Sequence, residues 1–304
     1  MGKIALLFPG QGSQYVGMAK DLYENYNTAK ELIDKANDLL GVDLKKIMFE
    51  GPEELLKQTE FTQPAIFLHS VVLYSLINKI KPDATAGHSL GEYSALVANG
   101  TLKFEDAIKL VRYRGQAMQK AGEENPGTMA AIVGLSIEDC QKVVEQAKDA
   151  GIVQCANFNS QIQTVISGSV VGVRKAMEIA KSSGAKIVKE LPVSGAFHSP
   201  LMQSAKEILL EKLNQVEFSD AKIPVYANVT AKPVTDKNEI KELLYQQVTA
   251  PVLWVDTIIN MIKDGFTDFY EIGPGKVLTG LVKKIEPAAN CYNIDKAVDL
   301  VNFI

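Results

Sequence analysis

Gly87-His88-Ser89-Leu90-Gly91 is the stretch that indicates the fold of this chain. It has the form Gly-x-Ser-x-Gly, and the apolar residues Leu90, Tyr93 and Leu96 recur after it at helical spacing. A serine between two glycines, at a tight turn from strand to helix, is typical of a nucleophile elbow, which exposes the hydroxyl above a sheet. The free N–H groups at the start of the helix lie where an oxyanion would form during acyl transfer. Residues 82–86 leave room for only a short strand before this turn.

The composition excludes several classes of protein. The chain has 304 residues, 46% of them hydrophobic, which is enough to bury a large core. Its formal net charge is -4 and its lysines are scattered, so we expect no nucleic-acid partner. Cys140, Cys155 and Cys291 form neither a metal-ligand spacing nor a disulfide framework. Since no apolar run reaches the length of a membrane span, and Ile4–Phe8 is too short for a secretory core, we expect a cytoplasmic protein without a membrane partner.

The secondary-structure pattern changes part-way along the chain. Lys3–Phe8 is an unbroken apolar run that predicts a strand, and helical patterns follow over residues 17–40 and 64–80. Residues 127–193 instead show the order strand, helix, strand, strand, helix, strand. This order is that of a ferredoxin-like unit, whose two ends lie close together and allow it to be inserted into a larger domain.

These patterns predict two domains. The larger is expected to be an α/β-hydrolase-like domain with a central, mostly parallel sheet, formed by residues 1–125 and 195–304. The smaller is expected to be a ferredoxin-like insert of residues 126–194. The boundaries lie at the Pro/Gly-containing segment before residue 128 and at Ser194-Gly195.

Only three histidines could serve as a base for the serine. His69 lies in an apolar helical segment, where a packed core histidine is expected. His88 adjoins Ser89, but neighbouring side chains diverge on a sharp turn, so a structural hydrogen bond is expected for it. His198 lies in a loop just before a helix that Ser199 and Pro200 begin. From the residues alone, His198 is equally well a base that reaches across to the serine or a surface histidine.

Arg114 lies in the middle of an apolar helical face. At 100° per residue it shares a side with Leu110, Val111 and Met118, whereas Arg112 falls on the polar side. A charge in that position is costly unless it meets an anion. Two interpretations stay open: a buried structural ion pair, or a receptor for a substrate carboxylate.

The motifs together resemble the malonyl-CoA:acyl carrier protein transacylases of fatty-acid synthesis, which are related to polyketide-synthase acyltransferase domains. The likeness spans nearly the whole chain. Its motifs are Phe8-Pro-Gly-Gln-Gly-Ser-Gln14, Thr62-Gln-Pro64, Gly87-His-Ser-Leu-Gly-Glu-Tyr93, Arg114-Gly115 followed by Met118-Gln119, Gly195-Ala-Phe-His-Ser199 and Glu271-Ile-Gly-Pro-Gly-Lys-Val-Leu278.

The resemblance implies a serine–histidine dyad. Ser89 would be the nucleophile and His198 its base, while Arg114 would bind the free carboxylate of the malonyl group. The backbone N–H groups of Gln11 and Leu90 would form the oxyanion hole. The implied reaction carries malonyl from malonyl-CoA through a malonyl-serine to the phosphopantetheine thiol of acyl carrier protein, with ping-pong kinetics and no metal or redox cofactor.

The resemblance also implies supporting roles for four residues. The backbone carbonyl of Gln247 would orient the histidine ring. Gln63, Met118 and Phe197 would contact the substrate, with Phe197 limiting the acyl pocket to small groups.

Two other functions share some of these features. A serine hydrolase of the α/β-hydrolase or patatin kind uses the same elbow with water as acceptor, but usually adds an acidic triad member, and none stands out here. A non-catalytic module that docks a carrier protein would leave Arg114 without a role. Release of CoA from malonyl-CoA, with and without a carrier protein, discriminates among the three.

Overall fold

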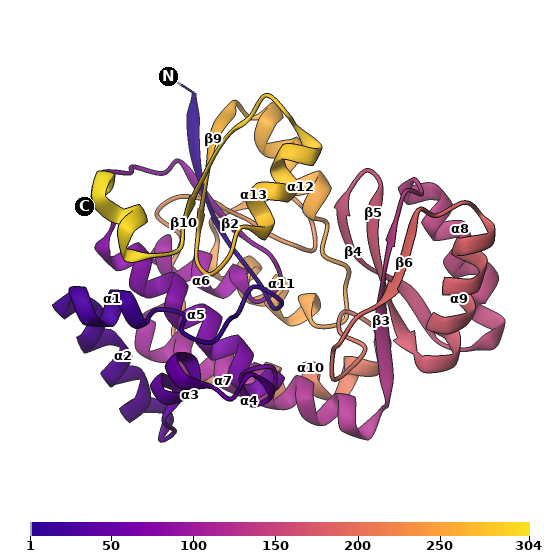
Figure 1. Ribbon diagram of the computed structural model, residues 1–304, viewed down its shortest axis with the longest axis horizontal. Coiled ribbons are helices and arrows are strands. Elements are labelled where there is room, and N and C mark those ends of the chain that lie inside the picture. The colour runs from indigo at the N-terminus through magenta and orange to yellow at the C-terminus, as the bar shows by residue number, and fades with distance from the viewer. Residues whose placement is uncertain (1) are drawn as a thin grey trace.

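The computed structural model describes residues 2–304 and contains two separate β-sheets (Figure 1). In the six-stranded sheet the strands lie in the order β10-β9-β1-β2-β7-β8, and every neighbouring pair is parallel except β7 and β8. Their bounds are β10 Asn290–Ile294, β9 Phe266–Ile272, β1 Lys3–Phe8, β2 Ala84–Gly87, β7 Val225–Tyr226 and β8 Pro233–Val234. The expectation of an α/β fold with a mostly parallel central sheet is therefore confirmed.

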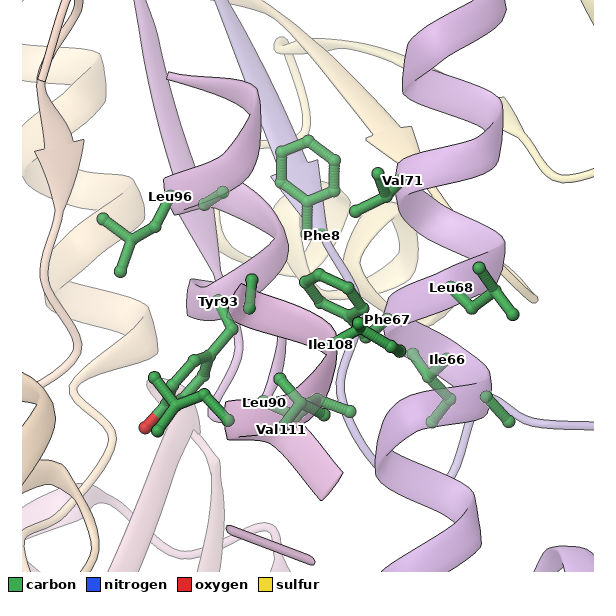
Figure 2. Packing of buried hydrophobic residues seen from close by; sticks show 14 of the residues in the cluster. Phe8, Ile66, Phe67, Leu68, Val71, Leu90, Tyr93, Leu96, Ile108 and Val111 are labelled. Atoms are coloured by element: carbon green, nitrogen blue, oxygen red, sulfur yellow. The ribbon is translucent and has the colours of Figure 1, made fainter. Parts of the chain in front are cut away.

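Alternate residues of β1 face two different cores. Leu6 and Phe8 pack with helices of one face, and Ala5 and Leu7 pack with helices of the other, as the period of two in a strand requires. Figure 2 shows Phe8 among buried side chains that include Phe67. The first face is covered by α5 Thr59–Leu76, α6 Gly91–Ala98 and α7 Phe104–Glu124, and the second by α12 Trp254–Lys263 and α13 Val277–Ile285.

The remaining helices of this layered part pack against α5 and α7, directly or through one another. They are α1 Lys20–Asn25, α2 Asn27–Leu40, α3 Leu44–Glu50, α4 Glu53–Leu56, α10 Gln203–Gln215 and α11 Lys237–Gln247. No helix within residues 2–304 is both long enough and apolar enough to cross a membrane.

The four-stranded sheet is antiparallel throughout, with the order β4-β5-β3-β6. Its elements follow the chain as β3 Gly127–Val133, α8 Ile137–Ala147, β4 Val153–Ser160, β5 Gln163–Ser169, α9 Val170–Ser182 and β6 Ile187–Glu190, the element order expected from the sequence. In Figure 1, α8 and α9 lie on the face turned away from the larger sheet. Ala130 and Ile132 of β3 pack under these helices, whereas Met129 and Ala131 face a cavity on the other side.

Three sequence predictions of local structure are wrong. The helix expected over residues 17–40 is two helices, because Tyr26 has an extended backbone that separates α1 from α2. The strand predicted from the sequence over residues 224–228 is only Val225–Tyr226, so Asn228 lies beyond the sheet. The helix expected from Pro64 begins five residues earlier, at Thr59, and ends at Leu76.

Arg112 explains why Pro64 is tolerated inside α5. Proline has no N–H to donate to the carbonyl four residues earlier, that of Glu60. Arg112 Nη1 donates to this carbonyl instead, and Arg112 Nη2 lies 2.7 Å from the Glu60 carboxylate. Arg112 is therefore largely buried, and its expected place on the solvent-facing side of α7 is wrong.

Candidate active site

The Gly87–Gly91 turn begins where β2 ends beside β1. Gly87 is paired with Phe8, so the loops that follow the two parallel strands emerge together. A Cβ on Gly87 would lie 1.9 Å from the carbonyl carbon of Gly91, and a Cβ on Gly91 would lie 2.0 Å from the carbonyl oxygen of Phe8. The turn is closed so tightly that only glycine fits at these two positions. Between them Ser89 has a left-handed backbone, with φ 51°.

Ser89 Oγ lies 2.8 Å from His198 Nε2. The other ring nitrogen, Nδ1, lies 2.8 Å from the carbonyl oxygen of Gln247 and 3.1 Å from that of Ala250. Because both of these partners are acceptors, Nδ1 must carry the proton, and Nε2 is left with a lone pair that faces the serine hydroxyl. The partners of Nδ1 are therefore main-chain carbonyls and not an acidic side chain.

His198 is neutral over a wide pH range. Its side chain is buried, and burial lowers its pKa to about 3, with the nearby positive charge of Arg114 as the next cause. Its carbonyl oxygen accepts a hydrogen bond from Gln154 Nε2, a side chain of β4 that also donates to the carbonyl of Thr249. The small sheet thus contributes to holding the histidine loop, which also has a left-handed backbone at His198 (φ 56°).

Arg114 is 1% exposed and projects from α7 into the same site. Nη1 donates to Gln63 Oε1 at 2.7 Å, and Nη2 donates to Ser89 Oγ and to Gln247 Oε1, each at 3.1 Å. Within residues 2–304 no carboxylate lies within ion-pair distance of it, and its Nε has no partner. Burial lowers the pKa of this guanidinium, because it removes water from around the positive charge. An anionic ligand beside Arg114 would therefore be strongly stabilised.

A cavity of about 270 Å³ joins these groups. It is lined by eight of the nine site residues expected from the sequence: Gln11, Gln63, Ser89, Leu90, Arg114, Met118, Phe197 and His198. Gln247 contributes its carbonyl to His198 and its side chain to Arg114. The far wall comes from the small sheet, through Met129, Ala131 and Val165.

Gln11 and Leu90 line this cavity, and their main-chain N–H groups have no protein acceptor within residues 2–304. Gln11 follows β1, and Leu90 is the residue that caps the N-terminus of α6. Neither N–H donates a hydrogen bond to any of residues 2–304. Two unused main-chain donors on residues that line the same cavity as Ser89 are the kind of group that binds an oxyanion.

Sequence reasoning missed two buried residues, Asn228 and Glu92, that form a hydrogen-bonded support for the elbow. Asn228 Oδ1 accepts from the Ser89 N–H at 2.7 Å, and its Nδ2 donates to the Gly87 carbonyl at 2.6 Å. Glu92 accepts from the Asn228 N–H at 3.0 Å, and burial raises the pKa of its carboxyl to about 7. Two features of the sequence could have indicated these residues. Asn228 is a polar residue just after a buried strand, and Glu92 is an acidic residue in the first turn of the helix that follows the elbow.

The two remaining histidines have the structural roles expected. His88 Nε2 lies 2.8 Å from Asn159 Oδ1 of β4, and its ring lies against Trp254. His69 is fully buried, and its Nε2 lies 2.7 Å from the carbonyl of Asp295. No group of three or more His, Cys, Asp or Glu side chains within residues 2–304 has an arrangement that could hold a metal ion.

Comparison with known proteins identifies the family. The family model of the acyl transferase domain matches residues 5–293. The malonyl CoA-acyl carrier protein transacylase of Bacillus subtilis (strain 168) is 48% identical over 288 residues, which are 94% of this chain and 91% of that protein. The chain belongs to the malonyl CoA-acyl carrier protein transacylase family. The resemblance inferred from the sequence motifs is thereby confirmed.

Solved structures of the transacylase family have the same fold over the whole chain. An acyl carrier protein S-malonyltransferase from Vibrio cholerae is 42% identical, covers 98% of both chains and has a TM-score of 0.94. A malonyl-transacylase in complex with its type II polyketide-synthase acyl-carrier protein is 38% identical, covers 99% of this chain and 98% of its own, and has a TM-score of 0.95. This transacylase chain is therefore comparable with its relatives from end to end.

Proposed function

We propose that this chain transfers the malonyl group of malonyl-CoA to the phosphopantetheine thiol of acyl carrier protein through a malonyl-Ser89 intermediate. The observation that carries the proposal is the meeting, in one cavity, of a serine–histidine pair with the buried, carboxylate-free guanidinium of Arg114. The names of the relatives supply the donor and the acceptor, malonyl CoA and acyl carrier protein.

The first half-reaction uses three groups of the site. His198 Nε2 takes the proton from Ser89 Oγ as the oxygen attacks the thioester carbonyl, and the resulting oxyanion is stabilised by the N–H groups of Gln11 and Leu90. Each such donor contributes about 3 to 4 kcal/mol to the transition state. The carbon–sulfur bond then breaks, and the proton on Nε2 passes to the CoA sulfur.

The second half-reaction reverses these steps with a different thiol. The phosphopantetheine thiol gives its proton to His198 Nε2 and attacks the malonyl ester carbonyl, and the Ser89 oxygen leaves and regains that proton. No atom changes its oxidation state, so the proposed chemistry requires no redox cofactor, and since main-chain N–H groups would bind the oxyanion, we expect no metal to take part.

Arg114 would select acyl groups that end in a carboxylate. Malonyl presents such a group to the unused donors of the guanidinium, whereas acetyl would leave the buried charge unpaired, at a cost of about 3 to 5 kcal/mol, or a discrimination of about 10² to 10³-fold. Gln63 would steady Arg114, and Met118 and Phe197 would bound the acyl pocket.

The finer architecture is also part of the proposal. We assign residues 126–194 to an inserted ferredoxin-like domain, supported by the strand order β6-β3-β5-β4 of an all-antiparallel βαββαβ unit. Residues 1–125 and 195–304 would form the α/β-hydrolase-like domain, supported by the elbow at the carboxyl end of a parallel strand. The three free thiols suit a reducing, cytoplasmic setting.

Intact-mass spectrometry after incubation with malonyl-CoA tests the proposal. We expect one malonyl adduct in the parent chain and at least a 10³-fold slower adduct formation in Ser89→Ala, on the order of the losses seen when a serine nucleophile is removed. Ser94→Ala is the matched control, because Ser94 is a buried serine of α6, the helix that follows the elbow, and its hydroxyl has no partner. We expect it to be malonylated like the parent.

Two further measurements distinguish a transferase from a hydrolase and test the role of Arg114. Fast CoA release without a carrier protein, and no acyl transfer when it is present, would assign the elbow to a hydrolase. In Arg114→Ala we expect the preference for malonyl over acetyl to fall by about 10² to 10³-fold; an unchanged preference would remove Arg114 from its role.

A further inference from the structure

The side-chain amide of Gln247 lies between a buried acid and a buried base. Its Nε2 donates to Glu92 Oε2 at 2.9 Å, and its Oε1 accepts from Arg114 Nη2 at 3.1 Å. All three side chains are almost fully buried, at 0 to 1% exposure. The carboxylate and the guanidinium are thus joined through one neutral amide instead of forming a direct ion pair.

Only one orientation of this amide satisfies its surroundings. Besides Glu92, the carbonyl oxygen of Ser89 lies 3.1 Å from Gln247 Nε2, and Asn228 Oδ1 lies 3.4 Å from it. A flipped amide would place its oxygen against these three acceptors and its NH2 group against the guanidinium. Buried polar groups without partners cost about 1 to 3 kcal/mol each, so the flip is strongly disfavoured.

Among those acceptors, Glu92 is the one that can bear a charge. It is held by the Asn228 N–H, and within residues 2–304 no cationic group lies within ion-pair distance of it. Charge-assisted hydrogen bonds are roughly twice as strong as neutral ones. In its ionised form, Glu92 is therefore the strongest determinant of which end of the Gln247 amide faces Arg114.

We propose that Glu92 is a positioning residue for acyl selection: through the Gln247 amide, it holds Arg114 against a neutral acceptor and so keeps the charge of the guanidinium available for the acyl carboxylate. The proposal rests on the proposed function, since it assumes that Arg114 receives this carboxylate. It differs from a purely structural role of Glu92 under the elbow. A structural role would affect every acyl-CoA alike, whereas this one acts on the substrate that carries a carboxylate.

The first test compares Glu92→Met with Glu92→Gln in the full chain, by the kcat/KM of CoA release from malonyl-CoA and from acetyl-CoA with holo-acyl carrier protein as acceptor. In Glu92→Met the amide of Gln247 loses its strongest anchor, and we expect the malonyl-to-acetyl ratio to fall about tenfold, the equivalent of one lost hydrogen bond to a charged group. Glu92→Gln keeps an oxygen for both donors, and we expect its ratio to stay within about threefold of the parent. An equal fall for both substrates in Glu92→Met would overturn the proposal.

A double-mutant cycle with Gln247→Met shows whether Glu92 acts through the amide. Gln247→Met removes the amide but keeps the main-chain carbonyl that His198 uses. If the proposal holds, adding Glu92→Met to Gln247→Met changes the malonyl-to-acetyl ratio less than about twofold, because the effect of Glu92 requires the amide. Full additivity of the two effects on the ratio contradicts it.

Gln247→Glu provides a test that does not depend on how Glu92→Met folds. It keeps the length of the side chain but places a carboxylate against Arg114. We expect the malonyl-to-acetyl ratio to fall at least tenfold, and a ratio equal to that of the parent overturns the proposal. Formation of malonyl-Ser89 by the parent chain reports separately on the proposed function, so that the two failures are distinguishable.

Discussion

Ser89 and His198 share an unusual backbone conformation but are held in it by different parts of the molecule. Both are non-glycine residues in the left-handed region, with φ of 51° and 56°. Each such residue costs of order 1 to 3 kcal/mol, which surrounding structure must offset. Around Ser89 the support comes from Gly87 and Gly91, which let the turn close against itself and against β1, and from the side chain of Asn228, which bonds to the Ser89 N–H and to the Gly87 carbonyl.

The loop of His198 depends on segments far away in the chain. Gln154 of β4 donates to the carbonyl oxygen of His198. The imidazole ring is oriented by the carbonyl of Gln247, the last residue of α11, and by that of Ala250, which lies just after this helix. Ser89 is therefore positioned by the end of the parallel sheet, whereas His198 is positioned where the small sheet meets the rest of the molecule. Damage to packing between the two sheets should affect His198 first.

The largest effect is expected from closing the space that the elbow needs. A Cβ at Gly87 would overlap the backbone of Gly91, so we expect Gly87→Ala to lower the free energy of unfolding by at least about 3 kcal/mol. Gly280→Ala is the control, because a Cβ on Gly280 of α13 would meet no heavy atom within 4 Å, and alanine there should stabilise by about 0.5 to 1 kcal/mol. Urea unfolding measures both. Equal stabilities would refute the claim that the elbow is closed by glycine contacts.

Removing the side chain that bridges the elbow should have the next largest effect. Asn228→Ala leaves the Ser89 N–H and the Gly87 carbonyl without their partner, and we expect a loss of about 2 to 4 kcal/mol. Asn260→Ala, which removes a single hydrogen bond to the Ala231 carbonyl, should cost less than half as much in the same urea titration. A similar loss in the two variants would mean that the elbow is held without Asn228.

The histidine loop is tested by Gln154→Leu. This change removes the donor shared by His198 and Thr249 while keeping the bulk of the side chain, and we expect malonyl-Ser89 formation to slow about tenfold, since a small misplacement of a base is costly. The matched control is Gln141→Leu, at an exposed position of α8 that lines a second cavity together with Gln154. Rapid-quench mass spectrometry gives the rates. An unchanged rate in Gln154→Leu would show that the loop does not need the small sheet.

The smallest expected effect is that of pH on the rate of malonyl-Ser89 formation. Because burial, and then the charge of Arg114, lower the pKa of His198 to about 3, the ring stays neutral and able to accept a proton down to that pH. We expect the rate of malonyl-Ser89 formation to change less than about threefold between pH 8 and pH 5, whereas an ordinary histidine with a pKa near 6.5 would lose activity below it.

Glu92→Gln is the control for this profile, because it removes a buried carboxyl group of the site whose pKa, about 7, lies between pH 5 and pH 8. In Gln154→Leu, looser packing should raise the pKa of His198, so that its activity declines at a higher pH than that of the parent. A decline centred near pH 6.5 in the parent and in Glu92→Gln would contradict a neutral, desolvated base.

The sequence alone determined the features that depend on short-range geometry. Two glycines around Ser89 predicted the elbow, and helical periodicity placed Arg114 on the buried face of α7, where it is 1% exposed. The unbroken apolar run of Lys3–Phe8 predicted the strand that lies beside the elbow. Spacing predicts such features because the periods of helices and strands, and the steric limits of a turn, are properties of neighbouring residues.

Tertiary structure decided what joins distant segments. The helix expected from Pro64 begins at Thr59 because Arg112, from another helix, satisfies the carbonyl that proline leaves free. Likewise, Asn228 bonds to the loop of Ser89 from 139 residues away, and Gln154 bonds to the loop of His198 from 44 residues away. Their importance comes from hydrogen bonds that exist only after both sheets have packed, since a buried polar group is satisfied by whichever partner the fold brings to it, and no local spacing encodes that partner.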